Sequence, residues 1–293
     1  MLLVRPDSGS HWYLPSGTAM HEVARADGKG TRPTTLRDAR RLGLYPSVTN
    51  VLSVLARPGL DAWRQEQEIL AVLSFPRRNG ERPDDFARRV AAEMNRRERD
   101  AADLGSAIHR AIELYARSGA VPAHPDVARL FEPAREWFDA EVGDVHAVEA
   151  AVAHAGWGFA GRVDLIATLR STGRPTVIDF KTQKTRTSRA GRFTPIFHDI
   201  WPLQLEAYRQ ALASREPAYS CAETASVVIG STEPVPVIEH VWDPLDAPSR
   251  FRAFLAARQL WVFTRGYCPV ADAPLPAAAT GRRPNPLPST DGF

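Results

Sequence analysis

The spacing of apolar residues divides the chain into a helical first half and a strand-rich second half. Before residue 143, apolar positions recur at helical intervals, and Gly, Pro, Ser and Thr mark where helices begin and end. The predicted helices are a short one capped by Ser47 or Thr49, one from near Asp61, one over about 84–117 that Gly119 ends, and one from about Asp126.

After residue 143 the period shortens. The runs "VHAVEAAVAH", "GFAGRVDLIATL" and "RPTVIDFK" alternate and are separated by turn residues, which predicts a cluster of antiparallel strands. A helix is expected over about 202–214, strands at "TASVVIG" and "PVIEHVW", and a last helix over about 248–264. This order predicts one α/β domain with a helical N-terminal part, and not a doubly wound sheet.

The same pattern sets the expected domain boundaries. Residues 1–45, with the loop-like "RADGKGTRP", are expected to form an irregular arm. Residues 46–268 are expected to form a single domain, with a helical part at 46–142 and a sheet with its helices at 143–268. Residues 269–293 include "APLPAAATGRRPNPLPSTDGF", which is rich in proline and is expected to be disordered.

Composition narrows the class of protein. With 44% apolar and 24% charged residues, the 293-residue chain has the profile of an ordinary soluble globular protein. No apolar run reaches membrane-spanning length, and the first residues lack the apolar stretch of a signal peptide, so a cytoplasmic protein is expected. Cys221 and Cys268 are too few for a disulfide framework, a Cys-based zinc site or an iron–sulfur cluster. The net charge of +3 decides little about a polyanionic partner.

Candidate chemistry is concentrated in a hairpin formed by "GRVDLIATL" and "TVIDFK". Strand alternation puts Asp179 and Lys181 on one face of the second strand. A turn at "STGR" would pair residues of the two strands whose numbers add up to about 343 to 345. Asp164 is therefore expected to lie across from both residues. Two converging carboxylates suit Mg²⁺, and a neighbouring ammonium can activate or hold an attacking water. Lys181 is informative because the chain uses arginine almost everywhere else. Of its 37 Lys and Arg residues, only Lys29, Lys181 and Lys184 are lysines. The alternative is a surface hairpin with an ordinary ion pair.

Two helices offer further polar groups. In "DLGSAIHRAIELY", an apolar stripe predicts packing on the sheet, with His109 and Glu113 one turn apart on its flank and Gly105 allowing close approach. A lone His there is most often a packed core residue, but beside two acids and a lysine it is a candidate metal ligand. In "PLQLEAYRQAL", Gln204 and Tyr208 share one face of what is otherwise an ordinary amphipathic helix, and both can hydrogen-bond across a crevice.

The order of these motifs resembles that of a known nuclease superfamily. His109, Asp164, Asp-x-Lys at 179 to 181 and Gln-xxx-Tyr at 204 to 208 resemble the RecB-type branch of the PD-(D/E)XK nucleases. "YPSVTNVL", "LDAWRQ", "LGSAIHRAIE", "AVEAAVAH", "GRVDLIA", "VIDFKT" and "PLQLEAY" are similar to the mitochondrial genome maintenance exonuclease family and its bacterial and phage relatives. The resemblance spans about residues 46–212. It implies a restriction-endonuclease-like α/β core, with a mixed central sheet flanked by helices.

The resemblance also implies a role for each residue. Asp164 and Asp179 would bind Mg²⁺ or Mn²⁺, with His109 and the backbone carbonyl of Phe180 as further ligands. Lys181 would orient or deprotonate the attacking water. Gln204 and Tyr208 would brace the site and contact the DNA strand. Glu149 and Glu113 are candidate additional acids.

Three departures refine the resemblance. Val163 stands before Asp164 in place of a proline, as is usual in this branch. The four cysteines of iron–sulfur relatives are absent, so no such cluster is expected. No GxxxxGK[ST] phosphate loop occurs, so a helicase part is absent as well.

A basic segment follows the candidate catalytic strand. Cations followed by aromatic residues are typical of single-strand binding, although a solvated loop anchored to the core by its aromatics is equally compatible. Ser47 and Thr49 at a helix start could contact a phosphate or act only as caps. The residues of the segment are Lys184, Arg186, Arg189, Arg192, Phe193, Phe197 and Trp201.

The sequence therefore predicts a metal-dependent exonuclease that acts on single-stranded DNA from free ends. DNA maintenance, repair or recombination in a bacterial or phage-infected host cell is the expected setting, with recombination or replication proteins as candidate partners. A structure-specific endonuclease and a non-catalytic DNA-binding module or subunit of a larger complex are the alternatives. Intact Asp164, Asp179 and Lys181 favour catalysis over the binding module.

Overall fold

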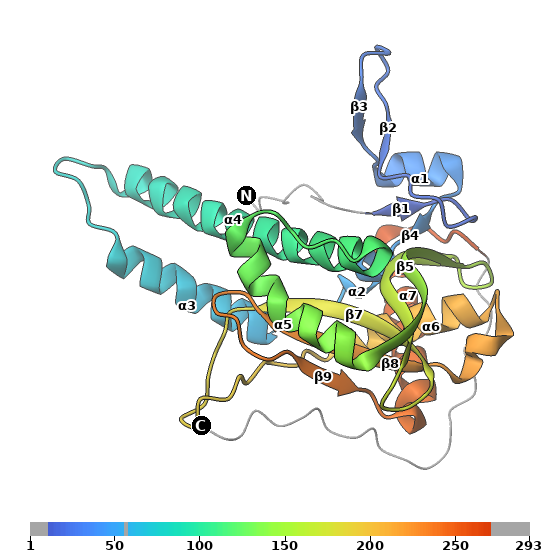
Figure 1. Cartoon of the computed structure of the whole chain (residues 1–293). Helices are drawn as coiled ribbons and strands as arrows, with labels where there is room; N and C mark the ends of the chain where they lie inside the picture. The colour runs from blue at the N-terminus through green and yellow to red at the C-terminus, as the bar shows by residue number, and fades with distance from the viewer. Residues whose placement is uncertain (1–10, 56–57, 271–293) are drawn as a thin grey trace.

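A five-stranded mixed sheet forms the centre of the computed structural model, which describes residues 11–55 and 58–270. Its strands lie in the order β5-β6-β7-β8-β9 (Figure 1). Neighbouring strands are antiparallel, apart from β7 and β8, which are parallel. The strands are β5 Val142–His154, β6 Phe159–Leu169, β7 Pro175–Gln183, β8 Glu223–Gly230 and β9 Ile238–Val241.

Helices cover both faces of this sheet (Figure 1). The helices α4 and α5 pack on one face through a core that includes Ile108 and Phe131, and α2, α6 and α7 pack on the other through a core that includes Leu205 and Phe254. Each fully buried Leu or Phe contributes about 1.5–3 kcal/mol relative to its exposed state. This architecture confirms the predicted α/β fold. The helices are α1 Leu36–Leu42, α2 Val48–Leu52, α3 Pro58–Ser74, α4 Pro83–Ser118, α5 Pro125–Glu141, α6 Ile200–Ala213 and α7 Ala247–Arg265, with 3₁₀ turns at Pro217–Cys221 and Pro244–Asp246.

The β6–β7 hairpin has the register expected from its sequence. Its paired residues run from Thr168 opposite Pro175 to Leu165 opposite Ile178, so their numbers sum to 343. The ladder ends at this last pair, and the next position would bring Asp164 opposite Asp179. Both acids therefore lie at the point where the two strands begin to separate.

The β7–β8 pair is parallel and makes the sheet a mixed one, as the resemblance implies. Parallel strands need a crossover connection of a dozen or more residues, and α6 supplies it. The crossover lays α6 over the sheet face that carries Asp179 and Lys181. The parallel pairing is thus what brings Gln204 and Tyr208 to the hairpin.

Strands β5 and β6 kink together beside this point. Glu149 has a φ of +52° and is the only non-glycine residue with a positive φ in the described part of the chain. The register pairs that flank the kink are Val148 with Leu165 and Ala150 with Val163. The first pair packs towards α4 and α5, and the second packs towards α6 and α7. Glu149 therefore lies opposite Asp164, at the position where both strands change sides.

The segment expected to be an irregular arm contains regular structure between residues 11 and 45. Strands β2 (Glu22–Ala24) and β3 (Thr31–Pro33) form a hairpin that projects from the body, and β1 (Trp12–Tyr13) pairs with β4 (Tyr45–Pro46) (Figure 1). Helix α1 begins with a capping box between Thr35 and Asp38, and Arg32 contacts both oxygens of Asp38 at 2.6 and 2.9 Å. Strands of two or three residues are too short to produce a periodic pattern, which explains the difference.

Helix α3 and the first half of α4 form an antiparallel pair that extends beyond the sheet (Figure 1). Helix α4 ends at Gly119 in the left-handed conformation, as the sequence predicts. Among the described helices, none is long and apolar enough to cross a membrane. Residues 271–293, which make up most of the predicted proline-rich tail, lie outside the described residues.

Candidate active site

Asp164 lies where β6 and β7 separate. Its Oδ2 accepts a hydrogen bond from the backbone N–H of Phe180 at 2.8 Å, so a side chain takes the place of the next backbone rung. The N–H and C=O of one strand residue point towards the same neighbouring strand, and the carbonyl of Phe180 therefore also faces β6. Burial and the charge of Asp179 raise the pKa of Asp164 well above its usual range. A cation at this place would favour the ionised form of Asp164.

Asp179 is more deeply buried, with 4% of its surface exposed. Its Oδ1 accepts a hydrogen bond from Gln204 Nε2 at 2.9 Å. Its Oδ2 lies 2.5 Å from Lys181 Nζ, but it makes no hydrogen bond of acceptable geometry. The ammonium of Lys181 is thus the partner of this buried oxygen, whose charge makes it suited to bind a cation.

Helix α6 supports the site from one face of the sheet. Gln204 Nε2 donates to the hydroxyl of Tyr208 at 3.2 Å as well as to Asp179, so one amide bridges the two. Burial, followed by the charge of Asp179, raises the pKa of Tyr208 well above its usual range, which keeps its hydroxyl protonated. Gly161 makes room for the tyrosine ring, because a Cβ at that position would lie 2.4 Å from Tyr208 Cε1.

Lys181 is held between an acid, an amide and an aromatic ring. Its Nζ lies 3.4 Å from Gln204 Oε1 and 5.8 Å from the centre of the Trp201 ring, in addition to its ion pair with Asp179. A compact ammonium in this cage is restrained near the carboxylates. It can therefore hold a water at a defined position by hydrogen bonding.

Helix α4 contributes His109 from the opposite face. His109 Nδ1 lies 3.6 Å from Asp164 Oδ2, and burial lowers the pKa of His109, which favours a neutral imidazole. A neutral imidazole can serve as a metal ligand. Gly105, one turn earlier, allows this approach, since a Cβ there would lie 2.9 Å from Thr182 Oγ1.

The two candidate additional acids lie next to these groups and are both ion-paired. Arg162 Nε lies 2.6 Å from Glu149 Oε2, and Arg117 Nε lies 3.1 Å from Glu113 Oε1. Arg117 also donates to the backbone carbonyl of Val148 at 3.0 Å, which fastens α4 to β5 at the kink. Burial raises the pKa of Glu149 in spite of the neighbouring guanidinium.

The donor set fits a hard divalent cation. Within residues 11–55 and 58–270, no three or more His, Cys, Asp or Glu side chains are arranged so that they could hold a metal ion by themselves. Mg²⁺, however, is usually bound through one or two carboxylates and several waters, and it does not need such a cluster. Asp164, the unbonded Oδ2 of Asp179 and the carbonyl of Phe180 are oxygen donors of that kind, and His109 adds a nitrogen.

The segment between β7 and α6 folds as a small basic hairpin. Thr187 pairs with Phe193, and the backbone N–H groups of Ser188 and Thr194 bond to the carbonyls of Arg192 and Arg186 at 2.8 and 2.9 Å. No acid occurs between Asp179 and Asp199. The hairpin and the residues that lead into it carry four exposed cations, and none of these is ion-paired within the described part of the chain. They are Lys184, Arg186, Arg189 and Arg192.

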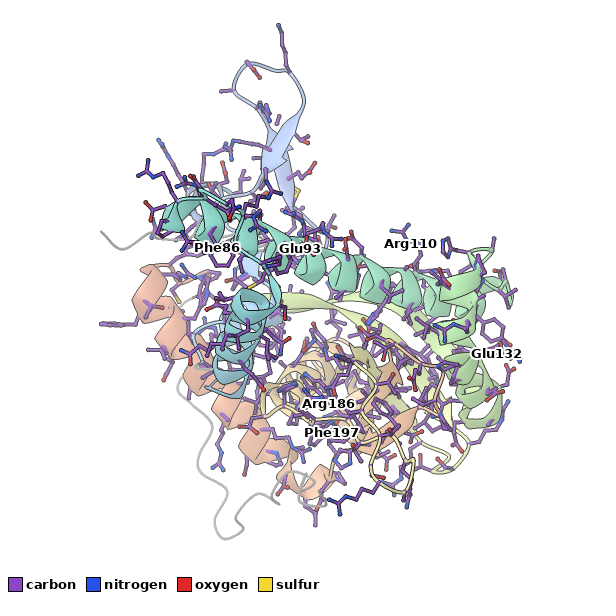
Figure 2. The ribbon with its side chains drawn as sticks, turned by 90° about the vertical axis from the view of Figure 1, so that its left-hand side faces the viewer. Phe86, Glu93, Arg110, Glu132, Arg186 and Phe197 are labelled. Atoms are coloured by element: carbon purple, nitrogen blue, oxygen red, sulfur yellow. The ribbon has the colours of Figure 1, made fainter. Side chains whose placement is uncertain are left out.

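The aromatic residues of this segment are not free for stacking. Phe193 and Trp201 are each 7% exposed and belong to the core. Phe197 packs on Trp201, His240 and Trp242, with ring centres 5.0 to 6.1 Å apart. Figure 2 labels Arg186 and Phe197, which both belong to this segment. The burial favours the alternative in which the aromatics anchor a basic loop to the core.

Ser47 and Thr49 have different surroundings. Ser47 is 4% exposed and caps α2, since its Oγ accepts from the backbone N–H of Asn50 at 3.0 Å. Thr49 is exposed, and its Oγ1 lies 3.0 Å from Ser47 Oγ. The capping role predicted for Ser47 is confirmed, and this burial favours the cap over a phosphate contact.

Two residues beside Asp164 were not identified from the sequence as part of the site. Gly161 accommodates Tyr208, and Arg162 pairs with Glu149. Their only signal in the sequence is the Gly-Arg pair directly before Val163 and Asp164. That pair becomes informative only once the kink opposite Glu149 is known.

A comparison with protein-family models identifies part of the chain. Among curated proteins, none matches the chain. A model described as the PD-(D/E)XK nuclease superfamily matches residues 127–237, a range that holds Asp164, Asp179, Lys181 and Gln204. Members of this superfamily are generally nucleases that use divalent metal ions such as Mg²⁺. Residues 127–237 therefore form a PD-(D/E)XK nuclease superfamily domain.

Proposed function

We propose that this protein is a metal-dependent exonuclease that hydrolyses phosphodiester bonds of single-stranded DNA from free ends. One observation carries the catalytic part of the proposal. The buried Oδ2 of Asp179 has no hydrogen bond, and it lies beside Lys181 at the end of the β6–β7 ladder, where Asp164 is its neighbour. A buried ion pair of this kind is weak support for stability, so a functional role is the better account.

The chain's own residues divide the chemistry between them. Asp164, Asp179, the Phe180 carbonyl and His109 would hold the divalent cation, which supplies a Lewis acid for the phosphate oxygens. Lys181 positions the attacking water and takes part in its proton transfer. Gln204 fixes the orientation of Asp179 and is itself fixed by Tyr208.

The nucleic-acid part of the proposal rests on the basic hairpin. Lys184 follows Lys181 by three residues, and Arg186, Arg189 and Arg192 extend the same positive surface. Exposed cations without acidic partners are the expected equipment for binding phosphates. Because this surface begins at the catalytic strand, a DNA strand bound to it would lead directly to Asp179.

DNA maintenance, repair or recombination is the proposed setting, with replication or recombination proteins as partners. The closer likeness to RecB-type and mitochondrial genome maintenance nucleases belongs to this proposal, and it rests on the motifs quoted above. A structure-specific endonuclease is the second candidate, because the catalytic residues alone do not distinguish internal from terminal bonds.

Digestion of matched linear and circular single strands tests the proposal. The same oligonucleotide, end-labelled in the linear form and internally labelled in both, is incubated with the full chain and Mg²⁺ or with EDTA. We expect the linear strand to be shortened from an end and the circle to be spared. Equal cleavage of the circle would contradict the exonuclease and support a structure-specific endonuclease. Binding of DNA without any cleavage would support a non-catalytic binding module.

A further inference from the structure

Three acids around the candidate site are each paired with a nearby cation. The exposed fractions of the cationic side chains differ widely, and they rank the cations by how easily a ligand can reach them. The values are 64% for Arg162, 53% for Arg117 and 23% for Lys181, whose partners are Glu149, Glu113 and Asp179. Arg162 is therefore the cation most accessible to a ligand.

Arg162 occupies a specific position on β6. It precedes Asp164 by two residues, so the two lie about 7 Å apart along the strand. Its direct cross-strand neighbour is Ala151, yet its guanidinium reaches diagonally to Glu149 at 2.6 Å. Within the described residues it has no other ion-pair partner. The pair thus connects an exposed cation with the acid that lies opposite Asp164.

Two histidines lie within the electrostatic range of Arg162 and add no positive charge beside it. His11 and His21 stack with their ring centres 4.4 Å apart. Burial is the main cause that lowers the pKa of both imidazoles, followed by the charge of Arg162 for His11 and by that of His11 for His21, which favours their neutral forms at neutral pH. An incoming phosphate would therefore find Arg162 as the cation to bind here.

Glu149 is held in a conformation that its neighbours must maintain. Its backbone is left-handed, which is unfavourable for a residue with a Cβ, and its side chain is 15% exposed. The register places it opposite Asp164. Loss of the Arg162 partner would leave this half-buried carboxylate opposite Asp164, where a cation would offset the two like charges.

We propose that Arg162 is a DNA-phosphate-binding residue, and that its ion pair with Glu149 couples the binding of DNA to the binding of a divalent cation. This inference rests on the proposed function and specifies how the same site is regulated. A phosphate that replaces Glu149 as the ion-pair partner of Arg162 leaves the negative charge of Glu149 unpaired beside Asp164. This unpaired charge strengthens the attraction of the site for a cation. By linkage, a bound cation that attracts Glu149 frees Arg162 for the phosphate and tightens DNA binding by the same factor.

The test measures binding without cleavage. Affinity for a fluorescent single-stranded oligonucleotide is measured by anisotropy with and without Ca²⁺, an oxygen-seeking cation used here as a probe, and the oligonucleotide is checked by gel to be intact. The converse experiment follows the Ca²⁺ midpoint of the thermal shift with and without oligonucleotide. For the unaltered chain we expect Ca²⁺ to tighten DNA binding at least about fivefold, with the same factor in the converse experiment.

Two variants separate this coupling from a general charge effect. Arg162→Gln should bind DNA within about twofold of the unaltered chain without Ca²⁺, because the guanidinium is otherwise occupied by Glu149, and it should lose the gain on adding Ca²⁺. Glu149→Gln should bind DNA more tightly without Ca²⁺, because Arg162 is already free, and it should gain little more from Ca²⁺. A merely structural role for Arg162 would lower the melting temperature and would change both DNA affinities equally.

Arg174→Gln is the matched control. The Arg174–Glu223 pair has nearly the same exposure as Arg162–Glu149, at 60% and 11%, but it lies at the far end of the sheet with a distance of 3.6 Å. This variant should retain the full coupling. Retained coupling in Arg162→Gln, or no coupling in the unaltered chain, would overturn the inference. Cleavage measured separately keeps the two proposals distinct, because a chain that cuts without coupling contradicts only this one.

Discussion

The substitution Gly161→Ala tests how closely α6 is fitted against the catalytic strand. The added Cβ would lie 2.4 Å from Tyr208 Cε1 and 3.2 Å from Cδ1 and Cζ, whereas ordinary contact begins at 3.4 Å. The nearest ring carbon must therefore retreat by about 1 Å, and Tyr208 is only 4% exposed. Overpacking of this kind costs about 1–3 kcal/mol, and each kcal/mol lowers Tm by roughly 2–4 °C in a chain of this size.

The same displacement should reach the carboxylates. Gln204 joins the Tyr208 hydroxyl to Asp179 Oδ1 through bonds of 3.2 and 2.9 Å, so a shift of the ring misplaces the acid. A misplacement of about 1 Å can cost on the order of 10²-fold in rate. We expect Gly161→Ala to lower both Tm, followed by circular dichroism, and kcat/KM on a linear single strand.

Gly105→Ala provides a milder comparison for this experiment. Its Cβ would meet only the hydroxyl of Thr182, at 2.9 Å, and the preference for alanine over glycine inside a helix, about 1 kcal/mol, offsets part of the cost of this contact. Its Tm should therefore fall less than that of Gly161→Ala. In a Tyr208→Leu background, the stability cost of Gly161→Ala should fall below about 0.5 kcal/mol, since the clashing ring is gone. A Gly161→Ala protein with the original Tm and rate would refute the packing argument.

Three other predictions concern charge. Lys181→Arg should impair single-turnover cleavage almost as severely as Lys181→Ala, by about 10²–10⁴-fold, because a guanidinium is wider and does not release its proton; an Arg variant within a few-fold of the parent would reduce Lys181 to an electrostatic clamp. Replacement of Arg186 and Arg189 by Gln should flatten the dependence of log K on log salt for single strands by about 1.4, and an unchanged slope would remove the basic hairpin from the binding surface. Hydrogen bonds from Arg32 hold the pKa of Asp38 well below its usual range, so Asp38 stabilises the fold above the unfolded-state pKa of about 3.9 and loses this effect as pH falls further. Asp38→Asn should then lower Tm at pH 7 and have progressively less effect below about pH 4; an equal loss at both pH values would contradict the ion-pair account.

Most of the fold could be predicted because its elements are long and periodic. The β6–β7 register followed from strand alternation and a tight turn, and it placed Asp164 opposite Asp179 at the end of the ladder. The parallel position of β8 could not be predicted in the same way. It depends on α6 crossing one face of the sheet, and no local pattern in "TASVVIG" records the direction of its neighbour.

The candidate site was predictable where it depends on residue type and order, and not where it depends on three-dimensional packing. Asp179, Lys181 and Gln204 are brought together as the motif spacing suggested. The burial of Phe193 and Trp201 could not be derived, because an aromatic residue after a basic run is compatible with either stacking on bases or anchoring in the core. The pairing of Arg162 with Glu149 likewise depends on a kink that sequence alternation does not reveal.

The most direct test of the central claim compares the unaltered chain with Asp179→Asn. A labelled linear single strand is incubated with each protein in Mg²⁺ and in EDTA, and DNA binding is measured in parallel. The account predicts Mg²⁺-dependent cleavage by the unaltered chain, none in EDTA, and none by Asp179→Asn, which should still bind DNA because the basic hairpin is untouched. Undiminished cleavage in EDTA or by Asp179→Asn would contradict the claim that these carboxylates form a metal-dependent nuclease site.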